Sequence, residues 1–100
     1  MRVIFSPEAR LELNDATTYY ENQSQGLGIR FRREVRDALK RMDAWSNAWS
    51  VEQGDIRRCL LVHFPYKLLY SIETDHLYVI AVAHLHRRPD YWVDRLPRNH

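Results

Sequence analysis

The spacing of the apolar residues changes at Asp55, and this change constrains the fold more than any other feature of the chain. Before that point, apolar side chains recur every three or four residues, which is the period of one face of an α-helix. After it, they alternate with polar residues or run together in short segments, as is typical of β-strands. A helical first half and a β-rich second half predict a single α+β domain over residues 1–100.

Two helices are expected between residues 7 and 46, with two glycines near their junction. Ser6, Pro7 and Glu8 predict the first helix start, because they supply a capping hydroxyl, a proline suited to the first turn and a negative charge near the positive end of the helix dipole. Glu12 is interpreted as a second acid of the same helix start. A short connection predicts an antiparallel hairpin. The expected buried stripes are Ala9, Leu13, Ala16 and Tyr20, then Leu27, Phe31, Val35, Ala38, Met42 and Trp45.

Four strands are expected, and residues 47–55 are predicted to form a loop. The last strand is continuously apolar in its centre, as in a strand covered on both faces. The order strand, helix, helix, strand, strand, strand predicts that the hairpin packs on one face of a small, mostly antiparallel sheet. The expected strands are residues 2–5, 56–63, 67–73 and 76–84.

The composition argues against several classes of protein. Cys59 is the single cysteine, so it cannot form a disulfide within the chain, and no cysteine or histidine spacing suggests a metal site. No cofactor is expected. The longest apolar run, from Leu77 to Ala83, is too short to cross a membrane. The N-terminus is charged too early for a signal peptide, so we expect a cytoplasmic protein without a membrane partner.

Arginine dominates the basic residues and concentrates in two parts of the chain. Residues 27–43 carry six bases and three acids, which gives a net charge of +3, and residues 84–98 carry four arginines and two acids, which gives +2. Guanidinium groups form planar, bidentate contacts with phosphate and carboxylate. The distribution therefore predicts RNA, DNA-associated machinery or an acidic protein as a partner, and an arginine-rich solvated surface fits it equally.

The densest group of reactive side chains closes the last predicted strand. Cleavage of RNA by attack of a 2′-hydroxyl needs a base, an acid and positive charge on the transition state, and histidine and arginine supply these without a metal. The alternative is a purely structural role, in which Pro89 fixes a turn while Tyr91 and Trp92 cover the end of the core. The candidate catalytic residues, if the chain is a nuclease, are His84, His86, Arg87, Arg88 and Tyr91.

A second set of residues is expected to contact RNA or another target. Successive strand residues point to opposite faces of a sheet, so one residue of the Arg57-Arg58 pair is expected on the open face with Lys67. Protection of a sheet edge by charge is the alternative for either arginine. The candidate target-binding residues are Arg57, Arg58, Lys67, Trp92 and Arg95.

Five segments follow one another over nearly the whole chain. They are Phe5-Ser6-Pro7-Glu8-Ala9, Arg30-Phe31, Ile56-Arg57-Arg58, Phe64-Pro65-Tyr66-Lys67-Leu68-Leu69-Tyr70, and Val79-Ile80-Ala81-Val82-Ala83-His84 leading into Arg87-Arg88. No single segment is diagnostic, but their order and spacing are specific. Together they resemble the RelE/ParE superfamily of toxins from type II toxin–antitoxin systems.

The resemblance implies a toxin neutralised by a co-encoded protein antitoxin, as in plasmid stabilisation or stress-response modules, with operator DNA contacted only through the antitoxin. Superfamily members divide into ParE-like inhibitors of DNA gyrase and RelE-like endoribonucleases that cut mRNA on the translating ribosome. The long hairpin and the sparse lysines favour gyrase inhibition, which we expect. The group around His84 and Arg87 favours mRNA cleavage, which is the alternative, and an inactive or purely regulatory relative is a third interpretation.

Overall fold

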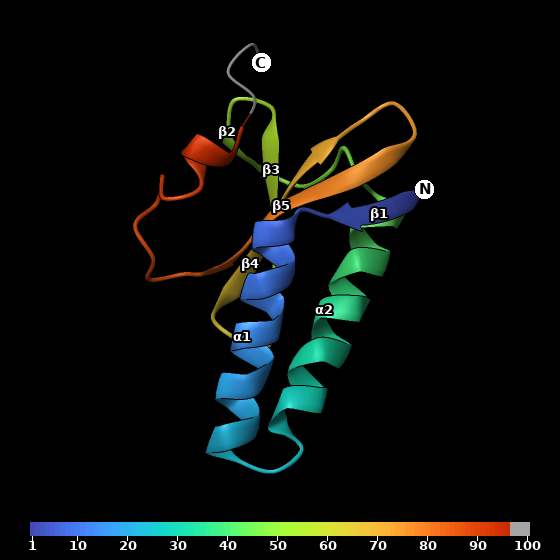
Figure 1. Cartoon of the computed structure of the whole chain (residues 1–100). Coiled ribbons are helices and arrows are strands. Elements are labelled where there is room, and N and C mark those ends of the chain that lie inside the picture. The colour runs from blue at the N-terminus through green and yellow to red at the C-terminus, as the bar shows by residue number, and fades with distance from the viewer. Residues whose placement is uncertain (97–100) are drawn as a thin grey trace.

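Residues 1–96, which the computed structural model describes, form a five-stranded sheet with two helices on one face (Figure 1). Arg98, part of the predicted C-terminal charge, lies outside them. The strand order is β1-β5-β4-β3-β2, with β1 parallel to β5 and the other neighbours antiparallel, which confirms the predicted α+β fold. The elements are β1 (Arg2–Phe5), α1 (Pro7–Gln23), α2 (Leu27–Ala44), β2 (Val51–Gln53), β3 (Ile56–Leu60), β4 (Tyr66–Ile72), β5 (His76–His84) and the 3₁₀ helix η1 (Val93–Arg95).

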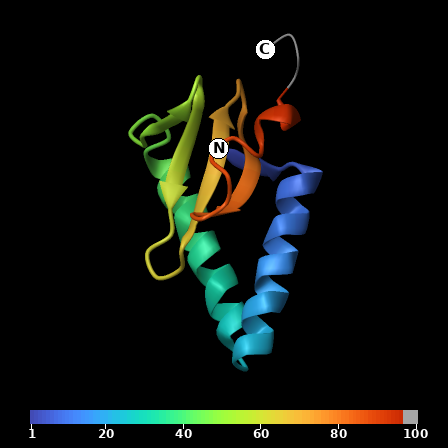
Figure 2. The same cartoon turned by 90° about the vertical axis from the view of Figure 1, so that its left-hand side faces the viewer.

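The hairpin is held at both ends by local hydrogen bonds. At the start of α1, the Ser6 hydroxyl accepts the Ala9 N–H at 3.0 Å, as the sequence predicts. At the closed end, the Glu21 carboxylate accepts the N–H groups of Gly26 and Gly28. Gly28 is also the point of close approach, because a Cβ there would lie 2.7 Å from the carbonyl oxygen of Thr17. Figures 1 and 2 show that this closed end projects well beyond the sheet.

The main core lies between the hairpin and the sheet. The predicted stripes of both helices pack in this core, with Tyr20 and Leu27 half-buried at its margin. The exception is Trp45, which is 63% exposed because α2 ends at Ala44. Trp49 is half-buried in its place and donates its indole N–H to the carbonyl of Arg41. The sheet contributes Cys59, Leu68, Tyr70, Leu77, Val79 and Val82 to this core, and the connection between β3 and β4 contributes Leu61 and Phe64.

A second, smaller core lies on the opposite face of the sheet. Trp92 is fully buried there by the chain that follows β5, and its indole N–H donates to the Pro89 carbonyl at 2.9 Å. Its buried neighbours from the sheet are Ile56, Leu69, Ile80 and Ala81. The prediction that β5 is covered on both faces is therefore confirmed, and the C-terminal segment supplies the second cover.

The main departure from the predicted strands is β2. Residues 47–55 were expected to form a loop, yet residues 51–53 pair with the start of β3. Gly54, with a φ of +58°, allows the tight return between the two strands. The strand expected over residues 56–63 ends at Leu60, where the chain turns toward α2. A strand of three residues is too short to show an alternating pattern, so β2 could not be recognised from the spacing of its apolar residues.

Candidate functional site at the end of the last strand

The edge of β5 is left bare where β1 stops. The register pairs Phe5 with Val79, so from Ile80 to His84 this edge of β5 has no strand beside it, while β4 pairs along the other edge. Side chains form hydrogen bonds with the backbone groups of this edge instead. The carbonyl of Ile80 accepts the hydroxyl of Ser6 and a guanidinium N–H of Arg95. This edge is where α1, β5 and the C-terminal segment meet.

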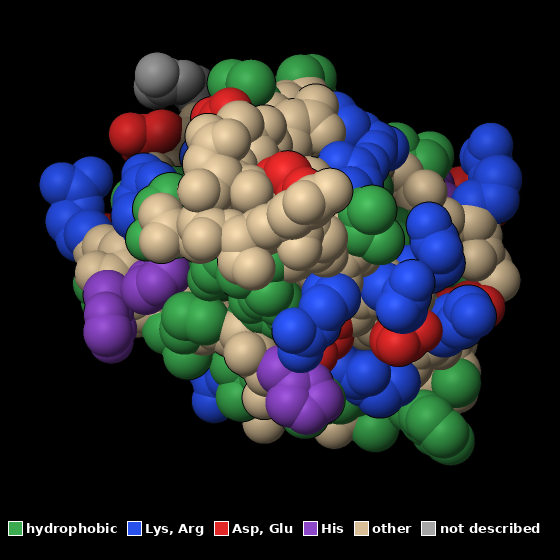
Figure 3. All heavy atoms as spheres, turned by 90° about the horizontal axis from the view of Figure 1, so that it is seen from below, with side chains coloured by type: hydrophobic (Ala, Val, Ile, Leu, Met, Phe, Trp, Pro, Cys, Tyr) green, Lys and Arg blue, Asp and Glu red, His purple; other side chains and the backbone are tan. Residues whose placement is uncertain are grey.

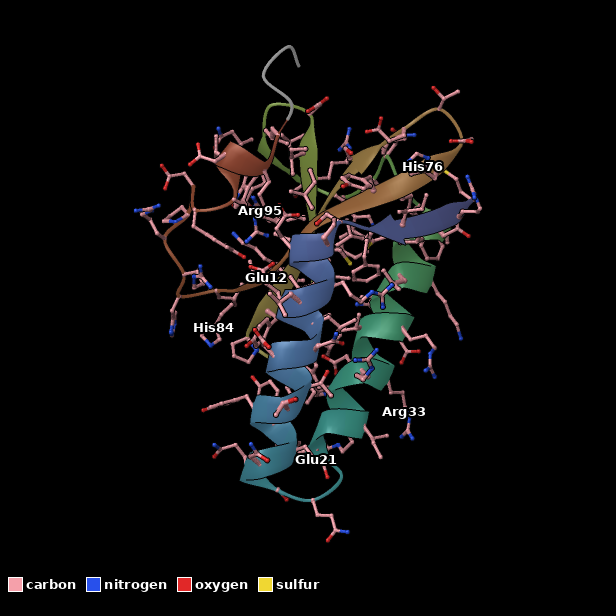
Figure 4. The ribbon with its side chains drawn as sticks, in the orientation of Figure 1. Glu12, Glu21, Arg33, His76, His84 and Arg95 are labelled. Atoms are coloured by element: carbon pink, nitrogen blue, oxygen red, sulfur yellow. The ribbon has the colours of Figure 1, made fainter. Side chains whose placement is uncertain are left out.

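Glu12 joins these three elements, and with Val82, Tyr91 and Arg95 it forms what we call the Glu12 cluster (Figure 4). Its carboxylate accepts the Val82 N–H at 3.0 Å, the Tyr91 hydroxyl at 2.7 Å and two guanidinium N–H groups of Arg95 at 2.9 Å each. Glu12 and Arg95 are only 16% and 18% exposed. The prediction that Glu12 is merely an acid of the helix start is therefore wrong, because its side chain turns to the edge of β5.

Tyr91 is held in a protonated state by this cluster. Burial raises the pKa of its phenol, and the hydrogen bond to Glu12 and that carboxylate's charge raise it further. The guanidinium of Arg87 stacks on the ring at 3.9 Å from its centre, and that of Arg95 lies 5.0 Å from it. Tyr91 thus serves as a hydrogen-bond donor and a platform for Arg87 at neutral pH.

His84 and His86 lie together on the α1 side of the sheet. Their ring centres are 5.1 Å apart, and the His86 N–H donates to Nδ1 of His84 at 3.0 Å. His84 also packs edge-to-face on Tyr66. A cleft of about 280 Å³ opens beside them, lined by Glu12, Asp15, Ala16, Tyr19, Tyr66, Val82, His84 and Arg87. The structure therefore brings His84, His86, Arg87 and Tyr91 into one neighbourhood, as the sequence predicted.

The target-binding residues predicted from the middle strands lie elsewhere. Arg58 and Lys67 are on the opposite face of the sheet, with Leu69, and both pair with Glu52 of β2, at 3.3 Å and 2.6 Å. Arg57 faces the helices and donates to the carbonyl of Trp49. One residue of the Arg57-Arg58 pair thus shares the open face with Lys67, as expected, but the sheet separates them from the histidines.

The remaining predicted residues belong to the C-terminal segment. Trp92 is fully buried, so its ring is not available to a partner in this structure. Arg95 is engaged by Glu12. Arg88 is exposed and pairs with Asp90 at 3.2 Å. Of the arginines predicted as site residues in the C-terminal segment, Arg87 and Arg88 are therefore the two whose side chains are exposed.

A groove between the helices was not predicted. It measures about 250 Å³ and lies between α1, α2 and β1. Its apolar lining is Val3, Phe5, Leu13, Val35 and Leu39, and its charged lining is Arg10, Arg32 and Arg36. Arg10 stacks on Phe5 at 4.6 Å from the ring centre. The available sequence signal was the spacing of Arg32 and Arg36 by one helical turn beside the buried stripe.

Comparison with known proteins identifies the family and a solved structure with a similar fold. A family model described as "ParE toxin of type II toxin-antitoxin system, parDE" matches residues 3–91. Among solved structures, a chain titled "Chromosomal ParDE TA system from P. aeruginosa" superposes with a TM-score of 0.61 at 10% identity, over 84% of this chain and 95% of that one. That likeness concerns the fold. A search of curated proteins found no match. In the described part of the chain, no helix is long and apolar enough to cross a membrane.

Proposed function

The chain belongs to the ParE family of type II toxins, and on that premise we propose that it inhibits DNA gyrase by binding rather than by cutting RNA. The observation that carries the proposal is that the sheet separates two of the predicted target-binding residues from the candidate nuclease residues. His84, His86 and Arg87 lie on the α1 side, whereas Arg58 and Lys67 lie on the other and are neutralised by Glu52. Charge stabilisation of a cleavage transition state needs cations aimed at the reacting phosphate.

The exposed loop after β5 is the surface proposed to contact gyrase. Arg87 and Arg88 are presented there by a segment that Trp92 and Arg95 fix to the body of the protein. A rigid backing lowers the entropy lost when a surface loop binds a partner.

A supercoiling assay tests this proposal. Purified toxin should abolish the supercoiling of relaxed plasmid by gyrase, and R87Q/R88Q should require at least ten times more protein for the same inhibition. R2Q/R10Q removes the same charge from another surface and should inhibit like the wild type. Normal supercoiling at saturating toxin overturns the proposal, and equal inhibition by R87Q/R88Q and wild type rejects this loop as the contact.

We also propose that a co-encoded antitoxin neutralises the toxin by laying an acidic, amphipathic segment in the groove between α1, α2 and β1. The groove combines an apolar floor with three arginines, which suits a segment of alternating apolar and acidic residues. R36E should weaken a complex purified from the natural operon, whereas R88E, with the same charge change on the far side, should leave it intact. Equal behaviour of the two variants contradicts this docking site.

The nuclease alternative retains one supporting observation, which is the contact between His84 and His86 beside Arg87. Two imidazoles within reach of one phosphate could act as base and acid. Primer extension on transcripts from induced cells would then show cuts in register with codons, and H84A/R87A would remove them. Intact transcripts in growth-arrested cells would eliminate this alternative.

A further inference from the structure

The two helices of the hairpin carry opposite charge. Residues 7–23 of α1 contain four acids and one arginine, a net charge of −3, and residues 27–44 of α2 contain six bases and three acids, a net charge of +3. Arg32 is the base of α2 that reaches back to α1, where it contacts Asn14 and Thr17. Contacts with α1 therefore do not account for the other bases of α2.

Two of the three carboxylates of α2 are engaged by groups outside the helix. Glu34 accepts the backbone N–H of His63 at 2.7 Å and lies 2.6 Å from Nδ1 of its ring. Asp43 pairs with the N-terminal ammonium group of Met1 at 2.8 Å. Neither carboxylate compensates an arginine of its own helix, and Asp37 is the acid left among the basic side chains.

Four exposed bases follow one another along α2, and we call them the α2 ridge: Arg30, Arg33, Arg36, which also borders the groove, and Lys40. All four are exposed, and none of them forms an ion pair with a residue in the range 1–96. Figure 4 shows Arg33 on the side of α2 that faces away from α1, and Figure 3 shows basic side chains gathered over the α2 side of the hairpin. The ridge is therefore a line of cations that form no ion pair within residues 1–96, with Asp37 as the acid among them.

We propose that the α2 ridge binds the phosphate backbone of duplex DNA without reading its sequence. At 1.5 Å per residue the ridge extends about 15 Å, which corresponds to roughly four phosphate steps along one strand. Guanidinium groups suit phosphate oxygens. The choice of operator sequence would remain with the antitoxin, and the toxin would add contacts to the phosphate backbone.

An acidic protein is the less suitable partner for this surface. Protein interfaces depend on apolar anchors at their centre. In α2, which is described over its full length, Ile29 is the one large apolar side chain that is exposed, and it lies at the helix start. The apolar surface of the hairpin lies instead in the groove, where Val35 and Leu39 contribute. Charge without an apolar anchor is the pattern of backbone binding to nucleic acid.

The test uses purified toxin and a short, fluorescein-labelled DNA duplex of mixed sequence, with no gyrase or antitoxin present, so its outcome is separate from that of the proposed function. Anisotropy is measured over a series of salt concentrations. The double variant R33Q/K40Q should weaken binding and make the slope of log Kobs against log salt shallower by about 1.8, because each lost phosphate contact removes about 0.9. D37N should tighten binding, because it removes the acid within the ridge.

The matched control is R2Q/R58Q, which removes two charges from β1 and from the face of the sheet opposite the helices, and it should bind like the wild type. Circular dichroism confirms that every variant is folded. Equal weakening by the two double variants assigns binding to net charge and overturns the proposal, as does an unchanged salt slope in R33Q/K40Q. Binding of polyglutamate in preference to the duplex also overturns it, in favour of an acidic protein.

Discussion

The Glu12 cluster and the α2 ridge are both built around arginine, but they differ in what surrounds the guanidinium groups. Arg95 is largely buried and has two hydrogen bonds to one carboxylate, one to a backbone carbonyl and an aromatic ring beside it. Arg33 is exposed and faces solvent from a helix whose acids are mostly engaged elsewhere. An arginine thus helps to join three elements of the fold in the Glu12 cluster, whereas in the α2 ridge it is left available to a partner.

Removal of Trp92 should have the largest effect, because the C-terminal half of the Glu12 cluster depends on its burial. Trp92→Ala empties the second core and should lower the free energy of unfolding by about 3–5 kcal/mol in urea titrations followed by far-ultraviolet circular dichroism. Trp45→Ala changes an exposed tryptophan and should stay within about 0.5 kcal/mol of the wild type. Similar losses in both variants would show that the second core contributes little.

Neutralising Glu12 tests the cluster directly. Glu12→Gln leaves the guanidinium of Arg95 without its carboxylate, and we expect a loss of about 2 kcal/mol, since hydrogen bonds to charged groups contribute about 1.5–3 kcal/mol. Glu8→Gln is the matched control, because Glu8 is an exposed acid on the same helix. The same urea titration measures both variants. If the two lose equal stability, the cluster acts no differently from a surface charge.

The pairing of Glu34 with His63 should make stability depend on pH. Burial tends to raise the pKa of Glu34, but the N–H and ring of His63, that ring's charge and the N–H of Val62 together hold it below its ordinary value. The stability gained is thus present above the ordinary carboxyl pKa and is lost as the pH falls through the folded-state pKa. Glu34→Gln should cost about 1 kcal/mol at pH 7 and markedly less in strong acid, as measured by urea titration at both pH values. A cost that does not change with pH would contradict the assignment.

Neutralising the ridge should have the smallest effect on the fold. Arg33→Gln removes a charge without an ion-pair partner among the described residues, so the free energy of unfolding should change by less than about 0.5 kcal/mol. Thermal melting at low and at physiological salt is a sufficient measurement. A loss comparable to that of Glu12→Gln would mean that the ridge stabilises the fold, and the contrast between the two regions would fail.

The sequence predicted the fold well because both of its periodic patterns have one strong cause, which is burial on a single face. The helix cap at Ser6, the strand Arg2–Phe5 and the strand His76–His84 agree with the structure at their stated bounds. The strand β2 could not be predicted, because its pairing is decided by the turn at Gly54 and by β3 rather than by any pattern of its own.

The candidate site was predicted less completely. Proximity along the chain placed His84, His86, Arg87 and Tyr91 together, and the structure agrees. The part played by Glu12 depends on contacts made across 70 or more positions of the chain, and no local pattern reports these. Glu12 follows Glu8 near the start of α1, which is why it was interpreted as a second acid of the helix start.

The parallel pairing of β1 with β5 has a consequence for the way the protein is made. The first strand to leave the ribosome has its strand partner in the last one, and the cover of that last strand includes Trp92, close to the C-terminus. The sheet edge and the second core therefore cannot form during synthesis of the first three quarters of the chain. The domain can complete its sheet and its second core only after β5 and Trp92 have been synthesised, so the surfaces that depend on them form late in the synthesis of the domain.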